Sequence, residues 1–491
     1  MRAHVVDPGN GRATRSFARR HMARWHVARN LASVAVGLVL LVMLVAGCAG
    51  RTPGPATDAQ ATSVSPLASI PADAVYSTPL PTVTLTPTQE AQPMIVTIGL
   101  WLPEELDPYG AGAGADVLAR QLNDFSEAYP DVQVEVTVKK VHGRGGLFDF
   151  LRTAKDAAPS VLPDLVVMDA NDLATTASSG LIQPLDELVS PPELNGRFPF
   201  ATELGAVAVP DTDETATMGF VIGVDMQQVA YRTELFDSRP ISWTQVVSPP
   251  VPMLFAASGR DREVNDATLI QYLAAGGKLT DPEGRPYLDA DVMVSVLDFY
   301  SDCMGTGTIS PTVALSIADA DQAWERFQAG EGGMAVVSAG QYWSWAQAEA
   351  DVADVEPAPG DELIAATSIP TRDGHAFSIA RGWAVAMVTD DPARQALATM
   401  LLEWLIAPAR NGEWTQAAGY LPGTRDALRM WNLSNADRAM LRGMMEAAVP
   451  EPSQDAMATA GRVMQEALVA VLRRRATPEE AVEAAVESLG P

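Results

Sequence analysis

Short strand-like runs alternate with helix-like stretches over residues 94–180, and this alternation restricts the possible fold more than any other feature. The strand-like runs are rich in apolar and β-branched residues, as strands buried in a sheet require. In the helix-like stretches, apolar residues recur at helical spacing. In chain order the six segments are residues 94–102, 116–129, 132–138, 147–157, 163–168 and 173–179. This order predicts an α/β lobe with a parallel, doubly wound sheet.

The length of the chain requires more than one such lobe. The chain has 491 residues, whereas a single hydrophobic core stops growing at about 250–300 residues. Even after the non-globular segments are set aside, we expect at least two lobes.

The N-terminal segment has the order of a secretory signal peptide. Residues 1–47 contain seven arginines and one acidic residue, and residues 31–47 form an apolar run. The run ends in Ala46-Gly47-Cys48, which resembles the bacterial lipobox. In that motif the cysteine is lipidated and becomes the first residue of the mature chain. The alternative is a plain membrane-anchor helix, for which this run is at the short limit.

Residues 48–93 begin with that cysteine and are rich in proline, threonine and serine, without apolar periodicity. Such a segment cannot bury enough apolar surface to offset the entropy lost on ordering it. We therefore predict a disordered, semi-extended tether between a lipid anchor and the folded body.

The composition excludes several classes of function. The chain has 34 Lys and Arg against 61 Asp and Glu, a formal net charge of −27, which would repel nucleic acid. Beyond the leader the only histidines are His142 and His375, and the two cysteines are Cys48 and Cys303. A histidine-rich zinc site and a disulfide framework are therefore excluded, and we expect no metal and no cofactor. Cys303 is expected to be a buried free thiol.

A series of short motifs along residues 95–481 resembles the family 1 extracellular solute-binding proteins, the substrate-capturing lipoproteins of ABC importers. The first strand ends in Leu-Trp, the third strand begins with Pro-Asp, and a late loop reads Gly-Tyr-Leu-Pro. The other matching motifs lie at residues 125–130, 179–185, 231–236, 242–245, 327–334, 391–404 and 477–481. Each motif alone is weak, but together they follow the order of the family.

The resemblance implies a two-lobed periplasmic-binding-protein fold of type II, like that of maltose-binding protein, with a hinge and a ligand cleft between two doubly wound lobes. The first lobe would comprise residues 94–223 and 374–430, and the second residues 224–373 and 431–491. The implied function is non-catalytic. A monomer, anchored outside the cytoplasm by lipidated Cys48, would capture a sugar or oligosaccharide and deliver it to ABC permease subunits.

Some positions depart from the family pattern. Gly223 stands where members usually have proline at the first crossing between lobes. Ala230 and Arg232 replace the Tyr and Asn that normally flank the residue matching Tyr231. These departures leave glycerol phosphates, other polyols and peptides open as ligands.

Candidate ligand-binding residues follow from the rule that ligands meet the carboxyl ends of strands in doubly wound sheets, and from the family motifs. Aromatic rings stack on sugars, and polar side chains bind hydroxyl groups. The candidates are Trp101, Glu104, Asp169, Asn171, Tyr231, Tyr342, Trp343, Trp345, Arg381 and Trp383. The alternatives are that Trp101 and Trp383 belong to the core, and that Asp169 and Asn171 only cap a helix. The resemblance favours Trp343, because the matching tryptophan commonly stacks on sugar.

Two other functions remain open at this point. A secreted polysaccharide hydrolase could use Glu104, Glu105 or Asp107, although neighbours in one loop seldom present two carboxylates across a bond. A sensor or scaffold would bind a solute without transport. The Gly-Ala repeat at residues 110–115 superficially resembles a dinucleotide fingerprint, but the connection from the preceding strand is too long for one.

Overall fold

The computed structural model describes residues 95–209, 212, 214–248, 250–259, 263–352 and 363–490. The predicted signal peptide, the candidate lipidation site Cys48 and the tether lie outside these residues. Within the described part of the chain, no helix combines the length and the apolar character needed to cross a membrane.

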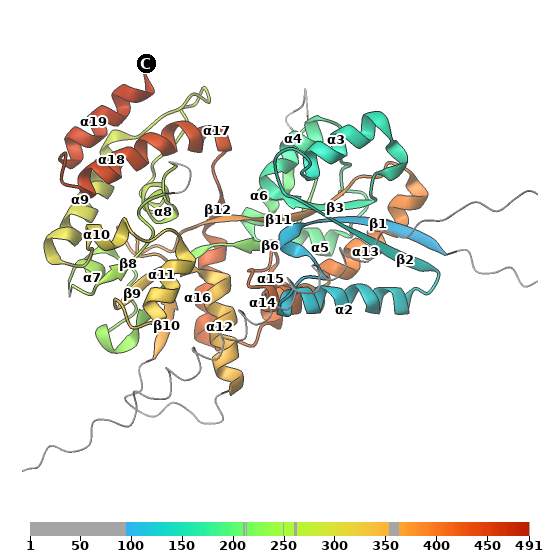
Figure 1. The fold of residues 1–491 in the computed structure, drawn as a ribbon, viewed down its shortest axis with the longest axis horizontal. Coiled ribbons are helices and arrows are strands. Elements are labelled where there is room, and N and C mark those ends of the chain that lie inside the picture. Colours follow the sequence, from blue (N-terminus) through green and yellow to red (C-terminus); the bar gives the residue numbers. More distant parts are fainter. Residues whose placement is uncertain are drawn as a thin grey trace, which may run out of the picture. The chain divides into compact units, whose positions relative to one another are not determined.

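A six-stranded sheet forms the centre of what we call the first lobe (Figure 1). Its strands are β1 (Val96–Pro103), β2 (Val132–Lys139), β3 (Leu165–Asp169), β6 (Phe220–Asp225), β11 (Ser378–Met387) and β12 (Ala448–Pro450). Strand β1 pairs in parallel with β2 and β3, as the alternating pattern predicts. Strand β11 runs antiparallel to β3 and β6, so the complete sheet is mixed.

The predicted helices of the first lobe are present. Helix α2 buries Leu118, Leu122 and Phe125 and ends just before Pro130, which cannot continue a helix. The helices assigned to this lobe are α2 (Ala113–Ala128), α3 (Leu147–Ala157), α4 (Leu173–Ser178), α5 (Pro191–Asn195), α6 (Pro199–Gly205), α13 (Pro392–Ile406), α14 (Pro408–Ala418) and α15 (Arg425–Met430). A small hairpin of β4 (Ala206–Ala208) and β5 (Thr215–Thr217) accompanies them.

The Pro-Asp motif before β3 has a structural role. Asp164 is almost fully buried and accepts a hydrogen bond from the Gly99 amide of β1 at 2.7 Å. Its two carboxylate oxygens also accept from Nε and Nη2 of Arg394 on α13, at 2.6 and 2.5 Å. A buried carboxylate must be paired, and this one links two strands to the helix that covers them.

A four-stranded sheet forms the centre of what we call the second lobe. Its order is β10 (Ile364–Thr367), β7 (Gln227–Arg232), β9 (Met334–Ser338) and β8 (Met253–Leu254). The surrounding helices are α7 (Trp243–Val247), α8 (Asp266–Ala274), α9 (Ala290–Thr306), α10 (Pro311–Ala314), α11 (Ala320–Gln328), α12 (Ala339–Val352), α17 (Gln454–Ala456), α18 (Arg462–Leu472) and α19 (Pro478–Leu489). Helix α19 begins with the expected capping box, in which Thr477 and Glu480 cap each other.

Three connections join the two sheets (Figure 1). Only Met226 separates β6 from β7, β10 leads to β11, and β12 leads to α17. Residues 431–450, which the sequence analysis assigned to the second lobe, contact both lobes. Strand β12 pairs with β11, and helix α16 (Asn435–Glu446) packs on α6 and α15, whereas Asp437 lies 4.0 Å from Arg239 of the second lobe. Amphipathic spacing alone could not reveal this position.

Cys303 is a free and fully buried thiol, as predicted. Burial, with a smaller contribution from Asp302, raises the pKa of this thiol to about 12. It is therefore protonated at neutral pH and is a poor nucleophile.

Candidate functional site

A cleft of about 620 Å³ takes its lining from both lobes. The first lobe contributes the carboxyl ends of β3 and β6, the middle of β11 and the loop after α14. The second lobe contributes β7, β9 and the amino ends of α8 and α11. The carboxyl ends of β3 and β6 thus lie where the rule for doubly wound sheets places a ligand, whereas β11 contributes its middle.

Arg381 of β11 is the centre of a charged cluster in this cleft. Its Nη1 and Nη2 donate to the two carboxylate oxygens of Asp266 on α8, at 2.9 and 2.6 Å. Nη2 also lies 2.8 Å from Oε1 of Glu451, directly after β12. Gln227 of β7 donates to Asp266 at 2.6 Å, and Asn171 donates to Glu451 at 3.2 Å. These bonds connect the first sheet with the second lobe.

The protonation equilibria of the cluster follow from burial and charge. Burial raises the pKa of Asp225, although a hydrogen bond from Ser338 and the charge of Arg381 act to lower it. Burial also raises the pKa of Glu451, although Arg381 opposes the shift. For Arg381, burial acts to lower the pKa, but Asp266 and the other neighbouring carboxylates outweigh it and raise the pKa. The arginine is therefore always charged, and its charge stabilises the ionised form of the carboxylates around it.

An aromatic wall lies beside this cluster. Trp383 and Tyr420 both line the cleft. Trp383 lies opposite Asp169 in the β11–β3 pairing, and the register of β11 against β6 shifts between Trp383 and Ala384. Such bulges re-aim side chains beside binding sites. Burial raises the pKa of Tyr420, although a hydrogen bond from the Trp383 side chain acts to lower it. The phenol therefore stays neutral at physiological pH.

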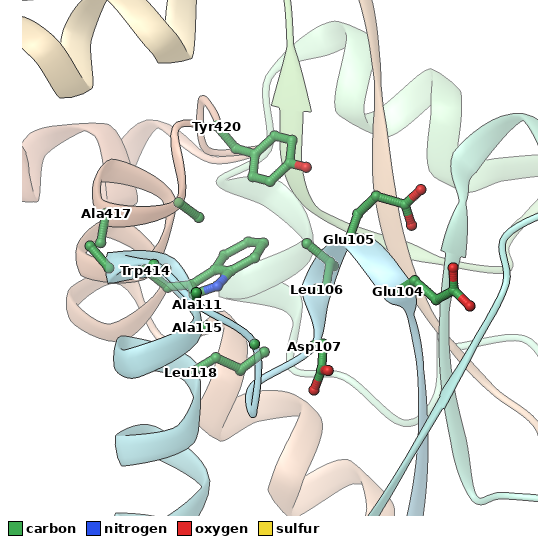
Figure 2. A pocket seen from close by; sticks show the side chains of 15 residues that line it. Glu104, Glu105, Leu106, Asp107, Ala111, Ala115, Leu118, Trp414, Ala417 and Tyr420 are labelled. Carbon is green, nitrogen blue, oxygen red and sulfur yellow. The ribbon is translucent and has the colours of Figure 1, made fainter. Parts of the chain in front are cut away.

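A smaller pocket of about 360 Å³ adjoins the cleft, because Ala418 and Tyr420 line both (Figure 2). Its other walls are the 3-10 helix Glu104–Leu106, the glycine-rich turn and the end of α14. The Trp414 ring stacks on Tyr420 at 5.8 Å. Glu104 and Glu105 are exposed, as the loop position predicts.

The glycine-rich turn has a packing role. A Cβ atom on Gly114 would lie 2.6 Å from the Cα atom of Ala418, so glycine allows α2 to approach α14 closely. Gly112 has φ of +127°, a value that other residues rarely adopt. These two constraints explain Gly112 and Gly114.

Five of the ten predicted ligand residues lie in or next to these two pockets. Asp169, Arg381 and Trp383 line the cleft, and Glu104 lines the smaller pocket. Asn171 contacts the cleft residue Glu451. Asp169 also accepts a hydrogen bond from the Asn171 amide at 2.9 Å, so the capping role considered for it is present as well.

The other five lie outside the linings. Trp101, Tyr231, Tyr342 and Trp343 are core residues, each at most 7% exposed. Trp343 donates through Nε1 to Gln228 at 3.2 Å, and the half-buried Trp345 packs against Trp324 at 5.1 Å. Residues 341–345 lie near the start of helix α12 and are not among the lining residues of either pocket, so their role as ligand contacts stays a prediction. One face of that helix packs on β7 and β9.

Several lining residues were missed. Asp225 ends a buried strand, and the strand-end rule would have found it. Tyr420 lies in the late Gly-Tyr-Leu-Pro motif, which is a family signature with no ligand role of its own in the sequence. Asp266 follows the helix cap Asn265, and Glu451 follows a three-residue strand. Neither position has a local sequence pattern that would mark it as a ligand contact.

The fold is similar to that of several solved binding proteins. One is the cyclic α-maltosyl-1,6-maltose binding protein from Arthrobacter globiformis, with a TM-score of 0.60, 17% identity and coverage of 80% of this chain and 98% of that chain. Maltose-bound MalE3 of T. maritima has a TM-score of 0.58 and 20% identity, over 80% of this chain and 99% of that one. An ABC transporter solute-binding protein from Agrobacterium radiobacter, in complex with ribitol, has a TM-score of 0.54 and 18% identity, over 81% and 99%.

These similarities establish the mixed α/β periplasmic-binding-protein fold that the motifs predicted. No curated protein matches the chain in sequence. The model of a family described as "Bacterial extracellular solute-binding protein" matches residues 121–439, more than half of the chain. The chain therefore belongs to the bacterial extracellular solute-binding proteins, a family of binding proteins and not of enzymes, as its sequence predicts.

Proposed function

We propose that this protein captures a small polyhydroxylated solute, a sugar or oligosaccharide, in the cleft and delivers it to an ABC permease. The observation that carries the proposal is the position of Trp383 and Tyr420 next to Asp169 and Asp225 in one cleft. Aromatic rings offer apolar faces to the C–H surfaces of a sugar, and carboxylates accept hydrogen bonds from its hydroxyl groups. The cleft volume of about 620 Å³ lies in the ordinary range for small-molecule sites.

Known proteins of the same fold support this choice of solute. The names of two of them state maltose or a cyclic maltosyl-maltose as the ligand, and a third is a ribitol complex of an ABC transporter binding protein. All three ligands are polyols or sugars. The transport partner is inferred from the resemblance to ABC importer lipoproteins and from the third of these names.

Hinge bending at the three interlobe connections would close the cleft over the solute. The hydrogen bonds from Arg381 of β11 to Asp266 of α8 already join the two sides of the cleft. The closed, loaded form would then be recognised by the permease subunits. A solute that binds without uptake in cells would favour the sensor or scaffold function.

Trp383 provides the test of this proposal. We expect Trp383→Ala to weaken binding of the preferred sugar about 10- to 100-fold, because the ring is a central aromatic contact. The measurement is isothermal titration of the full chain against maltose, maltotriose, ribitol and common monosaccharides. Trp404→Ala is the matched control, since Trp404 is also half-buried but packs on Phe125 and α2 outside the cleft. If no sugar or polyol binds the wild-type chain, the proposal fails.

We further propose that Cys48 carries the lipid that holds the protein at the membrane. In a bacterium that processes lipoproteins, we expect Cys48→Ser to move the protein from the membrane pellet to the soluble fraction, because each buried CH₂ of an acyl chain contributes about 0.8 kcal/mol. Cys303→Ala is the control and should stay in the pellet, since that thiol is buried in the second lobe. A Cys48→Ser protein that remains in the pellet would support the membrane-anchor helix instead.

A further inference from the structure

We propose that the solute of this cleft carries a protonated amine, so that the cargo is an amino sugar or a similar polyhydroxylated amine. The inference rests on the proposed function, because it specifies the charge of the solute that the same cleft would take.

The first step is the charge of the lining. Among the residues that the structure describes, seven carboxylates and one cation line the cleft. The carboxylates are those of Asp169, Asp225, Glu263, Asp266, Asp319, Asp321 and Glu451, and the cation is Arg381. Clefts lined by charge of one sign focus the field and concentrate solutes of the opposite sign. This cleft therefore attracts cations and disfavours phosphates and carboxylates.

The second step is that the two terminal nitrogens of Arg381 are already paired, although its Nε is buried without a partner among the described residues. Both of its terminal nitrogens bond to Asp266, and Nη2 also contacts Glu451. An arginine in a bidentate pair with a carboxylate has little capacity left for an anionic ligand. In the described part of the lining, the positive charge of Arg381 thus compensates Asp266 and Glu451. Asp169, Glu263, Asp319 and Asp321 form no ion pair with it.

The third step is that the negative charge is distributed over both walls. Asp169 and Asp225 end strands of the first lobe, whereas Asp319 and Asp321 begin helix α11 of the second. Among the residues that the structure describes, no three His, Cys, Asp or Glu side chains are grouped so that they could hold a metal ion. A distributed charge suits an extended organic cation with hydroxyl groups better than a bare metal ion.

The aromatic wall fits the same ligand. An ammonium group within about 6 Å of the face of a tryptophan or tyrosine ring is attracted by the ring quadrupole. Trp383 and Tyr420 provide two such rings in the same cleft as the carboxylates. An amino sugar would place its ring on the aromatic wall and its amine among the acidic groups.

The test compares sugars that differ only in charge. The probes are glucose, glucosamine and glucuronate, then galactose, galactosamine and galacturonate, titrated into the full chain at pH 6.5. We expect the amine of the preferred series to bind about tenfold tighter than the neutral sugar. The acid should bind weakest, and the advantage of the amine should shrink as salt rises from 50 to 500 mM.

Charge-neutralising variants locate the effect. The double variant Glu263→Gln/Asp321→Asn removes two charges of the lining but keeps hydrogen-bonding groups of similar size. It should reduce the ratio of the amine's affinity to the neutral sugar's affinity severalfold. Asp124→Asn/Glu127→Gln removes two exposed acids of α2, outside both pocket linings, and should change neither affinity. Neutral or acidic sugars that bind as tightly as the amine would overturn this inference and leave the proposed function standing. If no sugar of any charge binds, both are overturned.

Discussion

Trp343→Ala is expected to lower the free energy of unfolding by about 3–5 kcal/mol, the usual cost of truncating a buried tryptophan. Trp343 is 5% exposed, and its ring meets Tyr342 edge-on at 4.8 Å. Its Nε1 donates to Gln228, whose amide has no other hydrogen-bond partner among the described residues. The substitution would therefore leave both a cavity and an unsatisfied buried amide. Chemical denaturation measures the loss.

Two further variants make this result interpretable. Trp343→Phe keeps most of the ring volume and should lower the free energy of unfolding by less than half as much. This variant can still be measured if the alanine variant does not fold. Trp345→Ala removes a half-buried neighbour and should also cost less. If Trp343→Ala kept the stability of the wild type but abolished solute binding, the stacking role suggested by the family resemblance would be right and the core role wrong.

Arg381→Met is expected to destabilise the folded chain by about 2–4 kcal/mol at neutral pH. Removing one partner of a buried ion pair costs about 3–5 kcal/mol, and the partial exposure of this side chain reduces the cost. The variant leaves Asp225, Asp266 and Glu451 without their counter-ion. The expected loss is large because several carboxylates share one arginine.

The pH dependence of this variant has a definite sign. Burial already raises the pKa of Asp225 and Glu451, and the loss of Arg381 would raise both further. A carboxylate whose pKa is higher in the folded chain takes up a proton on folding. It therefore destabilises the fold above the folded-state pKa, and this cost disappears as pH falls below the unfolded value of about 4. The difference from wild type should shrink between pH 7.5 and pH 4.5.

Urea denaturation at both pH values measures this effect. Arg152→Met is the control, because Arg152 forms an exposed ion pair with Asp149 within one helix. That substitution should cost less than about 0.5 kcal/mol at either pH. An equal loss for Arg381→Met at pH 7.5 and pH 4.5 would show that the side chain acts by packing and not by charge.

Local patterns in the sequence predicted the elements of the first lobe well. Residues 147–157 are the helix that periodicity indicated, with the same bounds, and the strand predicted at 132–138 differs from β2 by one residue. Such elements depend on side-chain periodicity and on breakers such as Pro130, which are properties of neighbouring residues. The free thiol of Cys303 followed from the absence of a suitable partner cysteine.

The cleft could be predicted only in part. Asp169 was predicted because it ends a strand, and it ends β3 at the cleft. Arg381 and Trp383 were predicted beside a later strand, but they lie in the middle of β11. The aromatic segment at 341–345 lies near the start of a helix, which has two faces, and only packing decides which face is buried. The Trp343 side chain lies against β7, and its indole Nε1 donates a hydrogen bond to Gln228.

The sequence by itself determined the family, the order of strands and helices, the excess of acidic residues and the candidate lipid anchor, because each is encoded in local pattern or composition. Only the tertiary structure decided that Arg381, Asp266 and Glu451 meet, since they come from a strand, a helix and a loop separated by at least seventy positions. The charge that the cleft presents depends on this contact, because the pairing neutralises Arg381, the one arginine in the described part of the lining. Long-range electrostatic pairing has no periodic signature in the sequence, and it appears only once the chain has folded.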